Sequence, residues 1–179
     1  MDKDDKTMDR GFIQIYTGDG KGKTTAGLGL ALRAAGHGYK TFIGQFMKGQ
    51  YYGELSSLKN LPMIDIEQFG DEVCIRRDEV TDMHRKHGQD GINRIWQVME
   101  SGQYNIIIMD EICVSIWFGI VGTDAVLDIM KAKPYRVELV LTGRRAPEAL
   151  IDAADLVTEM KEIKHYYTKV ILARNGIER

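Results

Sequence analysis

The chain has 179 residues, of which 44% are hydrophobic and 28% are charged. This composition is typical of one soluble globular domain and excludes a disordered or fibrous chain. The 24 basic and 26 acidic side chains give a formal net charge of -2, so no overall attraction to nucleic acid or anionic lipid is expected.

No apolar run approaches the ~20 residues that cross a bilayer, and the charged start lacks the apolar core of a secretory signal. We therefore expect no membrane association and a cytoplasmic location. The two cysteines, Cys74 and Cys113, are isolated in the sequence, which predicts reduced packing residues and argues against a disulfide or zinc framework.

Residues 1–10 are short, polar and mixed in charge, so they are predicted to form a mobile amino-terminal arm. Residues 11–179 are predicted to form a single domain. The first predicted strand, residues 12–16, stops at a glycine-rich turn. A helix then begins at Lys23, with the apolar residues Leu28, Ala31, Leu32 and Ala35 at helical spacing.

Strand and helix patterns then alternate along the chain. Residues 40–46 predict a strand, Gly53 begins a short helix, and residues 64–69 predict a third strand. After an irregular stretch over residues 70–81, a helix buries one face and ends near Gly102; its apolar residues are Ile92, Ile95, Trp96 and Met99.

Residues 106–109 are continuously apolar, as expected of a strand that is buried on both faces. Strands at residues 137–141 and 156–158 flank a helix that Pro147 can start. The alternation predicts an α/β fold of the P-loop NTPase-like, RecA-like kind, with a doubly wound, mostly parallel sheet and helices on both faces.

The turn after the first strand is the first candidate site, and Thr17 to Thr25 reads TGDGKGKTT. A glycine-rich loop between a strand and a helix aims backbone amides and the helix dipole at an anion. Lys23 would add a positive charge and the Thr24 hydroxyl would bind Mg²⁺. The usual pattern places glycine where Thr17 stands, and counted from Gly18 the loop is one residue short; this departure puts the usual seating of the phosphates in question.

Asp110 and Glu111 follow the buried strand at the carboxyl edge, where ligands bind in α/β sheets. Such an acidic pair resembles the one that completes a nucleotide-bound Mg²⁺ site. Arg144 and Arg145 follow another strand at the same edge, where guanidinium groups meet either phosphate or a substrate carboxylate or amide, or else lie in a surface turn.

Two weaker patterns have competing interpretations. His84 and His87 have a spacing compatible with metal ligation, but without a third ligand solvent exposure is the favoured prediction. The apolar stretch around Trp117 and Phe118 predicts core packing, with one face as an alternative pocket wall for a large flat ligand, joined by Tyr51 and Tyr52.

These motifs, taken in order, resemble the ATP:corrinoid adenosyltransferases, and the resemblance covers residues 11–178. Its pieces are YTGDGKGKTT from Tyr16, RAAGHG from Arg33, QFMKG from Gln45, Gly53-Glu54, MDEI from Met109, LTGRRAP from Leu141, ADLVTEM from Ala154, IKH from Ile163 and NGIE from Asn175. The short phosphate loop is itself a feature of that family.

The resemblance implies transfer of the 5′-deoxyadenosyl group of ATP to the cobalt(I) of a corrinoid, with release of triphosphate. Implied catalytic residues are Lys23, Thr24 and Glu111, and implied metal ligands are Thr24, Asp110 and Glu111. The implied nucleotide-binding set is Gly18, Asp19, Gly20, Lys21, Gly22, Lys23, Thr24, Thr25 and Arg144. A reduced flavoprotein donor and a homodimer are also implied.

The sequence departs from relatives that place phenylalanine and tryptophan in the loop after the third strand. Phe69, Val73 and Ile75 are the substitutes available on the lower corrin face, and residues 166–168 also differ. Two other functions remain open: a small-molecule kinase or ATPase that attacks the γ-phosphate, and a non-catalytic binder of nucleotide or corrinoid.

Overall fold

The structure is a computed structural model that describes residues 8–178. Its six strands form one sheet in the order β3-β2-β4-β5-β1-β6, and every strand pairing is parallel. The strands are β1 (Ile13–Thr17), β2 (Thr41–Phe46), β3 (Ile64–Phe69), β4 (Ile106–Asp110), β5 (Glu138–Thr142) and β6 (Leu156–Glu159). The predicted parallel α/β fold is confirmed.

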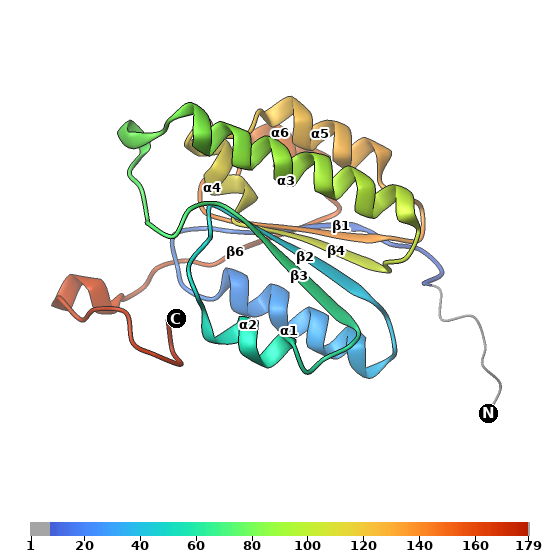
Figure 1. Cartoon of the computed structure of the whole chain (residues 1–179), viewed down its shortest axis with the longest axis horizontal. Helices are drawn as coiled ribbons and strands as arrows, with labels where there is room; N and C mark the ends of the chain where they lie inside the picture. The colour runs from blue at the N-terminus through green and yellow to red at the C-terminus, as the bar shows by residue number, and fades with distance from the viewer. Residues whose placement is uncertain (1–7, 179) are drawn as a thin grey trace.

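Helices cover both faces of this sheet (Figure 1). The helices α1 (Lys23–Gly36) and α2 (Gly53–Leu58) lie on one face; α3 (Asp82–Ser101), α4 (Ile112–Trp117), α5 (Thr123–Ala132) and α6 (Glu148–Ala153) lie on the other. Two short 3-10 turns, Arg77–Glu79 and Tyr166–Lys169, complete the elements. The two faces accordingly have separate apolar clusters.

The apolar patterns predict the buried faces of the helices only in part. In α3, Ile92, Ile95 and Met99 are buried as predicted. In α1 the prediction for Leu32 was wrong, because it is 58% exposed. The predicted residues Leu28, Ala31 and Ala35 do pack in the cluster on that face of the sheet, together with Ala34, and Gly27 is also buried. Small residues let α1 lie close to the sheet, a preference that a hydrophobicity pattern does not capture.

Residues 1–7 of the predicted arm lie outside the described residues. The last residue of that arm, Arg10, places its guanidinium 4.7 Å from the centre of the Phe12 ring, and the domain boundary at residue 10 stays a prediction. Within residues 8–178, no helix is long and apolar enough to cross a membrane.

The carboxyl ends of all six parallel strands meet at one edge, at the left of Figure 1. β5 lies between β1 and β4, so the loop after β1 and the acidic end of β4 are one strand apart. The chain after β6 returns to this edge as a carboxy-terminal tail, residues 160–178.

Candidate active site

The phosphate loop, Gly18 to Gly22, connects β1 to α1 and is held by the chain that follows β6. Gly18 and Gly22 have φ angles of 95° and 116°, which disfavour any residue with a side chain. A Cβ at Gly18 would lie 2.5 Å from the Met160 carbonyl oxygen. The Gly20 amide donates a hydrogen bond of 2.6 Å to that same oxygen, so the chain after β6 sets the shape of the loop.

Lys23 is the first residue of α1, and its side chain folds back into the loop. Its Nζ donates to the carbonyl oxygens of Gly18 at 2.7 Å and Gly20 at 2.6 Å. Burial lowers the pKa of Lys23, although Glu111 partly opposes this effect. The ammonium therefore lies at the amino end of α1, where the helix dipole also attracts anions.

Asp110 is 2% exposed and both of its oxygens are engaged. Its Oδ1 accepts hydrogen bonds from the hydroxyls of Thr24 at 2.9 Å and Thr142 at 2.7 Å. Its Oδ2 accepts from Lys48 Nζ at 2.8 Å and more weakly from Gln45 Nε2 at 3.3 Å. This carboxylate therefore ties together β2, β4, β5 and the start of α1.

Lys48 follows the carboxyl end of β2 and forms a largely buried ion pair with Asp110. Burial opposes the charged form of Lys48, but the Asp110 carboxylate outweighs it, so the pKa of Lys48 is raised. The ammonium also lies 5.0 Å from the centre of the Tyr52 ring. Lys48 thus stays charged at the base of the site.

Glu111 follows Asp110 with a φ angle of 60° and is the N-cap residue immediately before α4. Its amide donates to the Thr142 hydroxyl at 3.0 Å. Among the described residues, no hydrogen bond or ion pair engages its carboxylate. Burial and the neighbouring Asp110 charge raise the pKa of Glu111, so a cation placed at this carboxylate would relieve a real electrostatic cost.

A cavity of about 620 Å³ unites these groups, within the size range of ligand sites. The predicted residues that line it are Gly20, Lys21, Gly22, Lys23, Thr24, Thr25, Glu111 and Arg144. Three predicted residues lie around it instead: Gly18 accepts from Lys23, Asp110 lies behind Thr24, and Asp19 Oδ1 lies 3.9 Å from Arg145 Nε.

Tyr52 also lines the cavity, as one of the two predicted interpretations allowed. No role in the site was predicted for the remaining lining residues, which are Leu28, Lys48, Gly53, Glu54, Ser57, His165, Gly176, Ile177 and Glu178. Lys48 had a detectable signal, because it lies two residues after the end of β2, a buried parallel strand. The lining residues of the carboxy-terminal tail had no such signal, because they do not lie at the end of a buried strand. Its contact is an ion pair of 2.8 Å between Lys21 and Glu178, which joins residues at opposite ends of the chain.

The predictions for the histidine pair and for the two cysteines have mixed outcomes. His84 Nε2 lies 3.0 Å from Asp71 Oδ2, and His87 Nδ1 lies 3.3 Å from Asp71 Oδ1. Neither histidine is therefore simply solvent-exposed. In residues 8–178 no group of three or more histidine, cysteine, aspartate or glutamate side chains is arranged to hold a metal ion. Cys113 is buried as predicted, whereas Cys74 is exposed and the prediction of a packing role for it was wrong.

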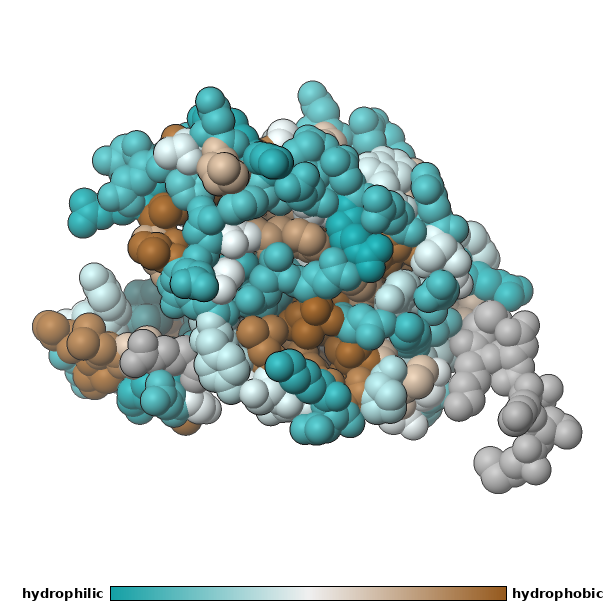
Figure 2. Space-filling view, viewed as in Figure 1, coloured by the Kyte–Doolittle hydropathy of each residue, from teal (hydrophilic) through white to brown (hydrophobic). Residues whose placement is uncertain are grey.

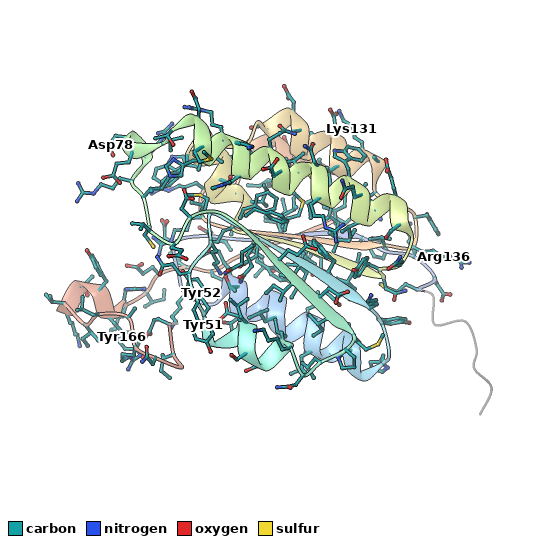
Figure 3. All side chains as sticks on the ribbon, viewed as in Figure 1. Tyr51, Tyr52, Asp78, Lys131, Arg136 and Tyr166 are labelled. Atoms are coloured by element: carbon teal, nitrogen blue, oxygen red, sulfur yellow. The ribbon has the colours of Figure 1, made fainter. Side chains whose placement is uncertain are left out.

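The aromatic residues that were candidates for a pocket wall lie in different surroundings. Tyr52 lines the cavity, whereas Tyr51 is 70% exposed and bonds to Ser56 (Figure 3). Trp117 and Phe118 pack edge to face with ring centres 5.3 Å apart. Trp117 is 42% exposed, so it was wrongly predicted as a core residue.

Comparison with known proteins identifies the family. The model of the family described as ATP:corrinoid adenosyltransferase BtuR/CobO/CobP matches residues 9–179. A corrinoid adenosyltransferase from a Sinorhizobium species is 33% identical over 97% of this chain and 82% of its own. The corrinoid adenosyltransferase of Escherichia coli K12 is 29% identical over 95% of this chain and 86% of its own.

A solved structure supports the fold alone. The KaiC-like protein PH0186 from Pyrococcus horikoshii aligns with a TM-score of 0.56 at 15% identity, over 88% of this chain and 76% of its own. Together with the phosphate loop and the acidic end of β4, the family match over nearly the whole length shows that the chain belongs to the ATP:corrinoid adenosyltransferase family.

Proposed function

We propose that this protein transfers the 5′-deoxyadenosyl group of ATP to the cobalt(I) of a reduced corrinoid. The cobalt electron pair forms the bond to the 5′ carbon, and the carbon–oxygen bond breaks with its electrons leaving on inorganic triphosphate. The single cavity in which the phosphate loop, the start of α1 and Glu111 meet carries the proposal, and the names of the relatives support it.

The proposed task of the protein is alignment and charge stabilisation, because a cobalt(I) nucleophile needs no general base. Lys23 and Arg144 supply positive charge beside the loop, and the amides of Lys21 to Thr25 supply donors that favour an anion at a helix start. Gly18 and Asp19 shape the loop from outside the cavity. Negative charge that develops on the leaving triphosphate would be stabilised most by these groups.

The oxygen atoms present fit a magnesium ion, since Mg²⁺ prefers oxygen ligands and keeps several waters. We assign Thr24 and Glu111 to hold it, because the Glu111 carboxylate is otherwise unengaged among the described residues. Asp110 is assigned to orient the Thr24 hydroxyl, since its own oxygens already accept from Thr24, Thr142 and Lys48. When bound, the ion would neutralise charge on the triphosphate.

Three further proposals come from the resemblance to the family. They are a reduced flavoprotein as electron donor, a homodimer, and a cytoplasmic location. Each is independent of the assignments in the cavity.

The decisive experiment is anaerobic incubation of the full chain with ATP, Mg²⁺, a chemical reductant and cobinamide or cobalamin. We expect intact triphosphate and a light-sensitive cobalt–carbon product in equal amounts. Production of ADP and phosphate without that product would establish a kinase or ATPase instead, and binding of ATP and corrinoid without turnover would establish a carrier.

The variant Lys23→Ala tests the site assignment. We expect kcat to fall by at least about tenfold, because an ammonium that stabilises leaving-group charge contributes on the order of 2 kcal/mol or more. The exposed Lys59 at the carboxyl end of α2, which does not line the cavity, provides the matched control, Lys59→Ala. Equal turnover by the two variants at saturating ATP would remove Lys23 from its role.

A further inference from the structure

The carboxy-terminal tail contacts the phosphate loop through Lys21. The Lys21 ammonium donates hydrogen bonds to the Glu178 carboxylate at 2.8 Å and to the Ile177 carbonyl oxygen at 3.1 Å. All three residues line the nucleotide cavity. A carboxylate of the tail therefore engages a cation of the phosphate loop at the wall of the cavity in which the polyphosphate is proposed to bind.

A turn of the tail fixes Glu178 in this position. Its carboxylate accepts hydrogen bonds from the Arg174 amide at 2.9 Å and from the Arg174 guanidinium, at 3.2 Å from Nε and 3.1 Å from Nη2. The same guanidinium lies 4.7 Å from the centre of the Tyr166 ring. Hydrogen bonds from Arg174 and then from Lys21 lower the pKa of Glu178 to about 2. The carboxylate is therefore ionised at neutral pH, and it resembles a phosphate group in its charge and in the donors that it attracts.

Apolar burial contributes little to holding the tail in place. Residues 161–178 are all exposed except His165 and Glu178, which are half-buried. Figure 2 shows apolar side chains on the surface of the tail, at the left. The four most exposed large apolar side chains of the described residues all belong to it: Ile163, Tyr167, Val170 and Leu172. A segment with so few buried contacts opens at a low free-energy cost, so its closure depends strongly on the polar contact with Lys21.

A polyphosphate would compete with Glu178 for Lys21. Both present anionic oxygens to the same ammonium, and their negative charges repel each other inside one cavity. Of the three lysines that line the cavity, Lys23 donates to carbonyl oxygens of the loop and Lys48 pairs with Asp110. The partners of Lys21 lie instead on the weakly packed tail, so they can leave without disturbing the body of the domain.

We propose that Glu178 holds the tail in an autoinhibitory position, in which its carboxylate takes the place of a phosphate group at Lys21. Binding of a polyphosphate displaces this carboxylate and releases the tail from the loop. Closure of the tail in turn weakens polyphosphate binding, because the two events share one coupling free energy. The proposal rests on the nucleotide site of the proposed function and adds a regulatory contact to it.

The first measurement is the affinity of the full chain for inorganic tripolyphosphate with Mg²⁺, by calorimetry. Glu178→Gln keeps the size of the side chain and removes its charge, so we expect tripolyphosphate to bind about 3- to 10-fold more tightly. Glu162→Gln, which removes an exposed charge elsewhere in the tail, is the matched control and should change the affinity by less than about twofold. In a Lys21→Gln background, Glu178→Gln should lose most of its effect, because the contact is already absent.

The second measurement is tryptic cleavage of the tail, between Lys161 and Arg174. We expect tripolyphosphate with Mg²⁺ to accelerate this cleavage about 2- to 5-fold in the wild-type chain. Glu178→Gln, whose tail is already released, should be cleaved at one rate with and without the ligand. Unchanged or slower cleavage of the wild-type chain on ligand binding would overturn the proposal, and so would equal affinities of Glu178→Gln and Glu162→Gln.

The two proposals fail in different ways. If tripolyphosphate binds and releases the tail but no corrinoid is adenosylated, the proposed function is wrong and the autoinhibitory contact stands. If neither ATP nor tripolyphosphate binds to the wild-type chain or to Glu178→Gln, both proposals are wrong.

Discussion

At the scale of single residues, Asp110 shows how a metal-site motif can serve an organising role. Its four hydrogen-bond donors come from Thr24, Gln45, Lys48 and Thr142, so its charge is balanced inside the protein. Glu111, one residue later, faces the cavity with a raised pKa. The two carboxylates are adjacent in sequence and have opposite surroundings.

Replacing Lys48 should therefore be costly. Lys48→Met removes the ammonium from a buried ion pair and leaves the Asp110 charge partly uncompensated, so we expect a loss of about 3 kcal/mol in the free energy of unfolding. Urea denaturation measures it. The double variant with Asp110→Asn should recover part of the loss, and an effect no larger than that of the exposed Lys59→Met would contradict the ion-pair account.

The two cysteines should differ in reactivity. Burial, aided by the charge of Glu111, raises the pKa of the Cys113 thiol to about 12. At pH 8 this raised pKa keeps Cys113 in the unreactive thiol form, whereas Cys74 is exposed. Titration with a thiol reagent at pH 8 should detect one group in the native protein and two in urea; two groups in the native protein would refute the burial of Cys113.

At the scale of the elements, α3 depends on close packing against the sheet. A Cβ at Gly91 would lie 2.6 Å from Cε1 of Phe46 and 2.9 Å from Cγ of Phe69. Gly29 in α1, by contrast, has no such neighbour within 4 Å. Comparing the same substitution at the two glycines therefore separates the effect of packing from that of helix propensity.

We expect Gly91→Ala to lower the free energy of unfolding by about 1–2 kcal/mol, because overpacking outweighs the gain in helix propensity. Gly29→Ala, the control, should raise it by up to about 1 kcal/mol. Thermal and urea unfolding measure both changes. Stabilisation by both substitutions would mean that α3 lies farther from Phe46 and Phe69 than described.

At the scale of the whole molecule, the tail closes the cavity by joining distant residues. The Glu178 carboxylate accepts hydrogen bonds from Lys21 and Arg174. The bond from Arg174 has the larger effect, and together they lower the pKa of Glu178 to about 2. Because the folded pKa is depressed, this contact is fully present above pH ~4.5 and is lost as the pH falls toward 2. Tail closure is therefore complete at neutral pH.

Glu178→Gln should open the tail at neutral pH. We expect tryptic cleavage between Lys161 and Arg174 to accelerate by up to about fivefold, since an exposed ion-pair network contributes modestly. Glu162→Gln, an exposed change in the same tail, is the control. Identical cleavage rates would show that other contacts hold the tail.

The sequence predicted the six strands and the main helices because their patterns are local: periodic apolar residues end at glycine or at polar edges. It also predicted the part of the cavity lining that comes from the phosphate loop, Glu111 and Arg144, because these residues follow strand ends, where ligands bind in parallel sheets. It missed what depends on distant contacts. The roles of Lys48, Thr142 and Glu178 arise only when β2, β5 and the tail meet the phosphate loop.

The bond between the Gly20 amide and the Met160 carbonyl has a consequence for biosynthesis. During translation the phosphate loop leaves the ribosome long before Met160 and Glu178, the later residues that contact it. A nascent chain that already contains the complete nucleotide motif would therefore lack a finished binding cradle. Affinity for ATP would arise only after the segment that contains Met160 has emerged and packed on the loop.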